Sequence, residues 1–176
     1  MISRRNLKQE HELAVLNSFA EHLKMEGKSL EILEQPDPPE AIVNINKIKT
    51  WIEITDAFLD QEHARSLMSS IADEVPHIVD ETRVEDEIKP DFQSVVHGVI
   101  AKKYDKKTML QTHSTFGRGI LLVGIFTPFN SASGIALEER ENIRELVDNK
   151  SMAIFDKIYV YDGTLEHKFY LLFELI

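Results

Sequence analysis

The segment from residue 38 to residue 55, PPEAIVNINKIKTWIEIT, constrains the fold most, because it predicts a tight β-hairpin with a defined register. Short apolar strands flank Asn46 and Lys47, the pattern of two half-buried strands joined by a two-residue turn. The expected strands run roughly from 40 to 45 and from 48 to 55. The turn then fixes three facing pairs: Ile45 with Ile48, Val43 with Thr50, and Ala41 with Ile52. One step further out, Glu40 faces Glu53.

The pairing of Glu40 with Glu53 needs an explanation. Directly opposed residues have Cβ atoms about 4.5 to 5.5 Å apart, where like charges destabilise a sheet unless something neutralises them. A divalent cation would do so, because Mg²⁺ binds one or two carboxylates together with water and substrate phosphates. Strand alternation also puts Glu53 on the face of Trp51 and Thr55, away from the purely aliphatic positions. The alternative is that both acids lie at a solvated strand end and bind no ion.

The rest of the chain predicts helices and strands in mixed order. A helix over residues 3 to 26 carries Glu12, Leu16, Phe19 and Leu23 on one face and ends before Gly27. Further helices are expected at about 60–74, from Asp91 to the KKYDKK segment, and at about 136–149. Further strands are expected near 30–33, 119–126, 153–161 and 168–175, with an acidic surface connection at 76–89 and a polar loop before 119. This order predicts an α/β or α+β fold, with a mixed central sheet flanked by helices, in one domain spanning residues 1–176.

The composition limits the partners. The chain has 30 acidic and 20 basic side chains and a net charge of −10, so any nucleic-acid site must be a local basic patch. Because there is no cysteine, disulfides and thiolate metal sites are excluded, and a cytoplasmic setting is natural. The longest apolar run, residues 120–126, is far shorter than the ~20 residues that span a bilayer. We therefore expect a soluble protein with no membrane partner, whose oligomeric state, a homodimer included, the sequence leaves open.

Two short motifs suggest a family. The segments QPDPPEAIV and TWIEIT resemble the signature of the restriction-endonuclease-like PD-(D/E)xK nuclease superfamily, in which an acid opens one strand and an acid, any residue and lysine follow on the next. Glu40 matches the first acid and Glu53 the second. The resemblance covers roughly residues 3–126, with Glu40 standing where aspartate is usual and Thr55 where the lysine is usual. It implies a restriction-endonuclease-like core and a metal-dependent phosphodiesterase that acts on DNA.

The resemblance also implies roles for other acids. The first helix of that superfamily often contributes a further metal ligand, and here Glu12 lies on the inward stripe of the first predicted helix. Asp37 is the other spare acid. The predicted ligands of Mg²⁺ or Mn²⁺ are therefore Glu40 and Glu53, with Glu12 or Asp37 completing or orienting the set. The alternatives are that Glu12 is a boundary residue that reaches water, and that Asp37 only terminates a turn.

The missing lysine has a candidate substitute. Phe92, Val96, Val99 and Lys103 recur at helical spacing, so Lys103 continues the sheet-facing stripe and could reach the acids. The predicted catalytic set is Glu53, Lys103 and the substituted position Thr55. The alternative is that Lys103 only decorates a helix end, where the macrodipole favours cations, together with its neighbours Lys102, Lys106 and Lys107.

Two functions follow from these residues. In the first, the acids hold an ion that polarises a phosphate and lowers the pKa of water, and Lys103 stabilises the charge that develops on phosphate oxygens. In the second, a nuclease-like fold has lost catalysis and binds nucleic acid or a protein partner. Thr55 and the acidic net charge favour the second. A purely structural partner protein is supported only by the acidic segment 80–87.

Overall fold

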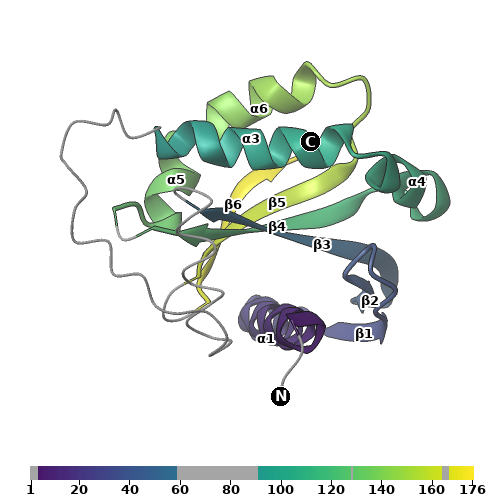
Figure 1. The fold of residues 1–176 in the computed structure, drawn as a ribbon. Helices are drawn as coiled ribbons and strands as arrows, with labels where there is room; N and C mark the ends of the chain where they lie inside the picture. Colours follow the sequence, from purple (N-terminus) through teal and green to yellow (C-terminus); the bar gives the residue numbers. More distant parts are fainter. Residues whose placement is uncertain (1–3, 59–90, 128, 164–166) are drawn as a thin grey trace.

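The computed structural model describes residues 4–58, 91–127, 129–163 and 167–176, and its centre is a six-stranded sheet with helices on both faces (Figure 1). The strands lie in the sheet in chain order. The strands are β1 (Leu30–Glu34), β2 (Ala41–Ile45), β3 (Ile48–Phe58), β4 (Gly119–Phe126), β5 (Phe155–Asp162) and β6 (Phe169–Glu174). The helices are α1 (Arg4–Met25), α3 (Phe92–Asp105), α4 (Lys107–Phe116), α5 (Ala132–Glu138) and α6 (Arg140–Asp148).

The sheet is mixed, as the order of elements predicted (Figure 1). Strands β1, β2 and β3 form an antiparallel meander, and β5 pairs with β6 in the same way. Strand β4 is parallel to both of its neighbours, β3 and β5. Parallel neighbours need long crossover connections, and α5 and α6 lie in the one that joins β4 to β5. The predicted α+β class with a mixed sheet is confirmed.

The hairpin register is also confirmed. All three predicted facing pairs of β2 and β3 are present. Asn46 and Lys47 have φ angles of 50° and 68°, the left-handed values that a two-residue turn of type I′ requires at both of its central positions. Glu40 lies just before the first residue of β2, because that strand begins at Ala41.

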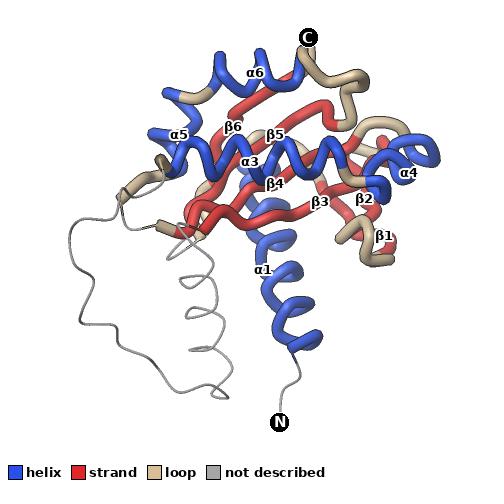
Figure 2. The backbone as a smooth tube through the Cα atoms, turned by 45° about the horizontal axis from the view of Figure 1, so that its top comes forward, coloured by secondary structure: helices blue, strands red, loops and turns tan. Residues whose placement is uncertain are grey.

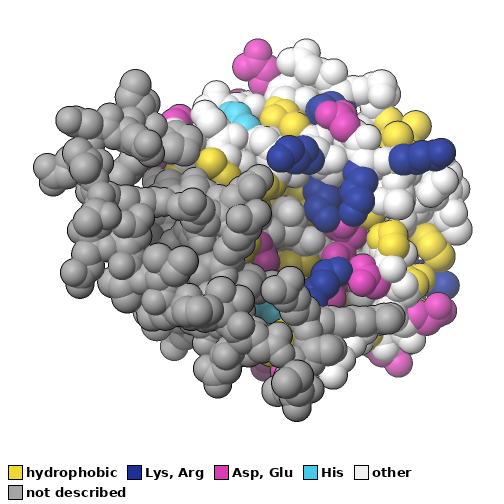
Figure 3. Space-filling view, in the orientation of Figure 1, with side chains coloured by type: hydrophobic (Ala, Val, Ile, Leu, Met, Phe, Trp, Pro, Cys, Tyr) yellow, Lys and Arg dark blue, Asp and Glu magenta, His cyan; other side chains and the backbone are white. Residues whose placement is uncertain are grey.

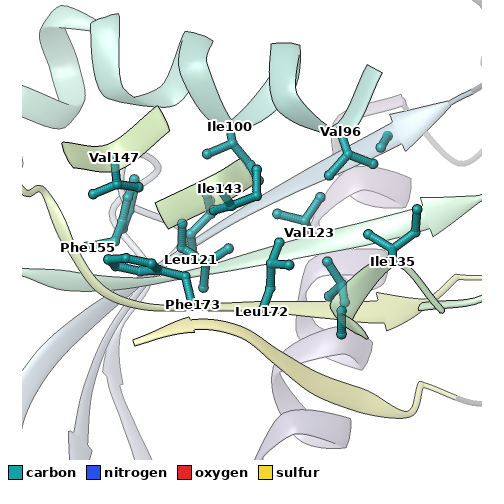
Figure 4. Close-up of a cluster of buried hydrophobic side chains, with 14 of the residues drawn as sticks. Val96, Ile100, Leu121, Val123, Ile135, Ile143, Val147, Phe155, Leu172 and Phe173 are labelled. Carbon is teal, nitrogen blue, oxygen red and sulfur yellow. The ribbon is translucent and has the colours of Figure 1, made fainter. Parts of the chain in front are cut away.

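Two apolar layers enclose the sheet. Helix α1 packs Val15, Leu16, Phe19 and Leu23 on one face, against inward residues of β2, β3, β4 and β5. Helices α3, α5 and α6 cover the opposite face (Figure 4). Strand β4 is buried on both faces, as its continuous apolar sequence predicted.

Some local predictions were wrong. The segment expected as a polar loop before β4 forms α4, which buries Met109 and Thr112 and ends at Gly117, whose φ is 76°. The helix expected at 136–149 is two helices, because Glu139 leaves the helical conformation between α5 and α6. The predicted helix at 60–74 and the acidic connection at 76–89 lie outside the described residues. Within the described ranges, no helix combines the length and the hydrophobicity that a bilayer span needs.

Candidate active site

Glu40 lies just before the first residue of β2, at the level where β3 extends beyond its pairing with β2. Extending the β2–β3 register would place residue 39 opposite Ile54. The carbonyl of Pro39, however, accepts the backbone N–H of Asp37 at 2.9 Å. The backbone N–H of Ile54 donates instead to Oε2 of Glu40 at 3.1 Å. The Glu40 carboxyl therefore takes the place of a strand carbonyl at the open edge of β3, and its residue is only 6% exposed.

Glu53 meets Lys103 on the α3 side of the sheet. Glu53 is 1% exposed, and its Oε1 accepts a hydrogen bond from Nζ of Lys103. The buried stripe of α3 runs through Phe92, Val96, Ile100 and Tyr104, so Lys103 lies beside that stripe and reaches the acid with its long stem. Thr55 is half-buried at the next position of β3 that points to the same face. The cation that Thr55 cannot supply thus comes from α3.

The surroundings of Glu40 change its pKa. The pKa of Glu40 is raised to about 9, first by burial and then by the hydrogen bond to Glu53 and the negative charge of that residue. The Lys103 charge and the Ile54 N–H lower the pKa of Glu40, but by less. The raised pKa favours the protonated form of Glu40 at neutral pH, which lessens the repulsion expected between the two acids, and Lys103 places a positive charge beside Glu53.

Oε2 of Glu53 has no ordinary hydrogen-bond donor. This atom is buried, and no N–H or O–H group of the described residues is paired with it in a conventional hydrogen bond. The hydrogen bond between the two acids that raises the pKa of Glu40 brings their carboxyl groups together. The pair therefore contains a buried carboxylate oxygen without a conventional donor among the described residues.

Glu12 and Asp37 lie on the other side of Glu40. Nζ of Lys8 is 3.2 Å from Oε1 of Glu12 and 3.1 Å from Oδ2 of Asp37, so one lysine pairs with both acids. Burial raises the pKa of Glu12, although Lys8 opposes that effect. Among the residues that the structure describes, no three acidic or histidine side chains are grouped closely enough to form a metal site. The structure thus brings Glu40, Glu53 and Lys103 together and keeps Glu12 and Asp37 paired with Lys8.

A surface groove leads to Glu40 from the α1 side. Its volume is about 500 Å³, and it is lined by Asn6, Gln9, Glu10, Glu12, Leu13, Gln35, Asp37 and Glu40. Glu40 belongs both to this groove and to the acid pair with Glu53. Figure 3 shows basic side chains gathered over the C-terminal half of α3, with acidic side chains between that helix and α1. The acids therefore lie next to the cationic end of α3.

The sequence did not reveal a second polar cluster on β3. Oδ1 of Asp56 accepts a hydrogen bond from the Tyr161 hydroxyl at 2.9 Å, and Nε2 of His11 lies 3.3 Å from Oδ2 of Asp56. The hydrogen bond and charge of Asp56 raise the pKa of His11 against the effect of burial. A Cβ at Gly124 would lie 2.5 Å from Oδ1 of Asp56, so only glycine leaves room for this contact. A glycine and an acid within apolar strands were the available signals.

Comparisons with protein-family models, curated proteins and solved structures find no match for this chain, so the site itself has to carry the functional argument.

Proposed function

We propose that this protein is a magnesium-dependent phosphodiesterase that cleaves DNA. The observation that carries the proposal is the contact of Glu40, Glu53 and Lys103, two buried acids from the β2–β3 hairpin and a cation from α3. The motif resemblance implies two acids on neighbouring strands with a lysine beside them. Here α3 provides the lysine, because Thr55 stands at the usual position. The order α1, β1, β2, β3, α3, β4, with β4 parallel to β3, fits the restriction-endonuclease-like core that the resemblance implies as well.

The acid pair suits a hard cation. Mg²⁺ accepts one or two carboxylates and completes its shell with water and substrate oxygens, so three protein ligands are not required. Oε2 of Glu53 is a buried acceptor without an ordinary donor, and the proton of Glu40 is what an ion would replace. A bound Mg²⁺ would supply Lewis acidity and a lower pKa for water. Glu40 and Glu53 would hold it, and Mn²⁺ would fit the same ligands.

The side chains around the pair have separate tasks in this proposal. Lys103 is 15% exposed at its side chain and stabilises negative charge on the phosphate oxygens, as a preorganised cation does in a partly dry site. Glu12 and Asp37, joined by Lys8, line the groove by which solvent and ions reach Glu40. Thr55 leaves the usual lysine position without a charge, so the cationic task falls to Lys103 alone.

A second function is favoured by the same ion pair. Lys103 already balances the single negative charge shared by Glu40 and Glu53, so the pair is neutralised without a metal. Such a pair could be the remnant of a site in a nuclease-like module that only binds nucleic acid or a protein partner. Thr55 agrees with this second function.

Calorimetric titration with MgCl₂ and MnCl₂ separates the two functions. We expect the unsubstituted protein to bind metal and to cleave labelled DNA, and Glu53→Gln to lose both. Glu139→Gln is the matched control, because Glu139 is also buried but pairs with His97 at 2.7 Å in another part of the fold. Absence of heat at millimolar metal, with no cleavage, would contradict the enzyme and leave the binding module.

A further inference from the structure

Several segments of this acidic chain contain no acidic residue, among them residues 41–52, 92–104 and 106–137. The chain has 30 aspartates and glutamates against 20 lysines and arginines, yet residues 41–52 and 106–137 contain neither aspartate nor glutamate. These two segments carry the following cations: Lys47, Lys49, Lys106, Lys107 and Arg118.

The fold joins the two segments at one end of the sheet. The indole Nε1–H of Trp51 donates to the carbonyl of Gly117 at 2.8 Å, and the Thr50 hydroxyl donates to the carbonyl of Arg118 at 3.3 Å. Nζ of Lys49 lies 5.7 Å from the centre of the Phe116 ring. Figures 1 and 2 both show α4 at the same end of the molecule as the start of β3. We call this region the α4 surface, made of Lys47, Lys49, Lys106, Lys107, Phe116 and Arg118.

The α4 surface is exposed and its charges are largely unopposed. All of its cations are exposed, and only Arg118 forms an ion pair with a described residue, Asp156, at 3.4 Å. Phe116 is 37% exposed, so part of its ring faces solvent. Lys106 directly follows α3, the helix that carries Lys103, so the α4 surface continues from the candidate active site.

We infer that the α4 surface binds single-stranded nucleic acid, with phosphates on its lysines and a base stacked on Phe116. Local groups of cations attract a polyanion even when the net charge of the protein is negative. An exposed aromatic ring adds stacking with an unpaired base, which a duplex cannot offer because its bases are already stacked. The inference goes beyond the proposed function, because binding here requires neither the metal nor cleavage.

Fluorescence anisotropy with a labelled oligothymidylate in EDTA tests the inference without metal or cleavage. We expect Phe116→Ala to weaken binding by about fivefold to a hundredfold, the range for losing one base-stacking ring. Phe129→Ala is the matched control, because Phe129 is 69% exposed and follows β4, outside the α4 surface. Lys49→Gln and Lys107→Gln should each reduce the slope of log affinity against log salt by about 0.7, whereas Lys24→Gln on α1 should not.

The outcomes separate this surface from the active site. Equal affinity of Phe116→Ala and Phe129→Ala, in variants that melt like the unsubstituted protein, overturns the inference. So does a duplex that binds as tightly as the single strand. Normal binding of the oligonucleotide in EDTA, with no cleavage by the unsubstituted protein when MgCl₂ is added, would sink only the catalytic proposal. Cleavage with no effect of Phe116→Ala on affinity would sink only the α4 surface.

Discussion

Strand β3 carries two acids that the fold treats differently. Glu53 points toward α3, where it meets Lys103 and a protonated Glu40, and one of its buried oxygens lacks an ordinary donor. Asp56 points toward α1, where a neutral tyrosine hydroxyl and His11 engage both of its oxygens. Asp56 is therefore held by one hydrogen bond and one ion pair. Glu53 instead combines an ion pair with Lys103 and a buried oxygen to which no described residue donates a conventional hydrogen bond.

The largest expected effect comes from removing the cation of Glu53. Lys103→Met should lower the free energy of unfolding by about 3 to 5 kcal/mol at neutral pH, because it leaves a buried carboxylate without its counter-charge. Urea denaturation measures this loss. Lys102→Met, an exposed neighbour on α3, should change stability by less than about 0.5 kcal/mol. Adding Glu53→Gln to Lys103→Met should recover most of the loss. Equal, small losses from both lysines would show that Glu53 does not depend on Lys103.

On the α1 face, the corresponding change is Tyr161→Phe. Removal of the hydroxyl leaves Oδ1 of Asp56 without its 2.9 Å donor, and a hydrogen bond to a charged group contributes about 1.5 to 3 kcal/mol. Thermal and urea unfolding should both report a loss of this size. Tyr159→Phe is the control, since the Tyr159 hydroxyl has no hydrogen bond to a described residue, and its loss should be small. If the two variants were equally stable, the hydrogen bond between Tyr161 and Asp56 would contribute nothing measurable to the free energy of unfolding.

Sequence patterns predicted the local geometry around Glu53 but not the protonation of Glu40, and they did not reveal the Asp56 cluster. The β2–β3 register followed from alternation and a two-residue turn, and the approach of Lys103 followed from helical spacing. The proton on Glu40 depends on burial that only the assembled sheet creates. Asp56 and Tyr161 are 105 residues apart, so no spacing rule links them. The pairing of Glu12 and Asp37 with Lys8 likewise depends on the path of the chain between α1 and β2.

A pH titration of stability tests the proton on Glu40. The folded pKa of Glu40, about 9, is above its ordinary value of 4.5, so its contribution to stability is fully present below about 4.5 and is lost as pH rises toward 9. Glu40→Gln cannot ionise, and its amide can still accept from Ile54 and donate to Glu53. We expect its stability relative to the unsubstituted protein to rise with pH, by at most about 1.4 kcal/mol per pH unit. Parallel curves for the two proteins would mean that folded Glu40 is ionised throughout.

Substitution of His11 should change the free energy of unfolding least. Its contribution comes from a protonated base beside an acid, whereas that of Glu40 comes from a protonated acid. Asp56 raises the pKa of His11 above the ordinary value of 6.5, so the ion pair stabilises the fold below that value and is lost as pH rises through the folded pKa. Glu12 adds to this effect, while burial opposes it. The side chains of His11 and Asp56 are 35% and 23% exposed, so solvent screening limits the stabilisation to about 0.5 to 1 kcal/mol.

His11→Gln should therefore reduce the free energy of unfolding at mildly acidic pH and change it little at mildly alkaline pH, as measured by urea denaturation at both. Asp56→Asn should remove this pH-dependent difference, because it takes away the charge that raises the pKa of His11. A loss that is equal at both pH values would assign His11 to packing against the Phe126 ring, whose centre is 6.1 Å away. In that case the α1 face would hold its acid with the Tyr161 hydroxyl alone. The contrast with Glu53, which needs a full positive charge, would then be sharper.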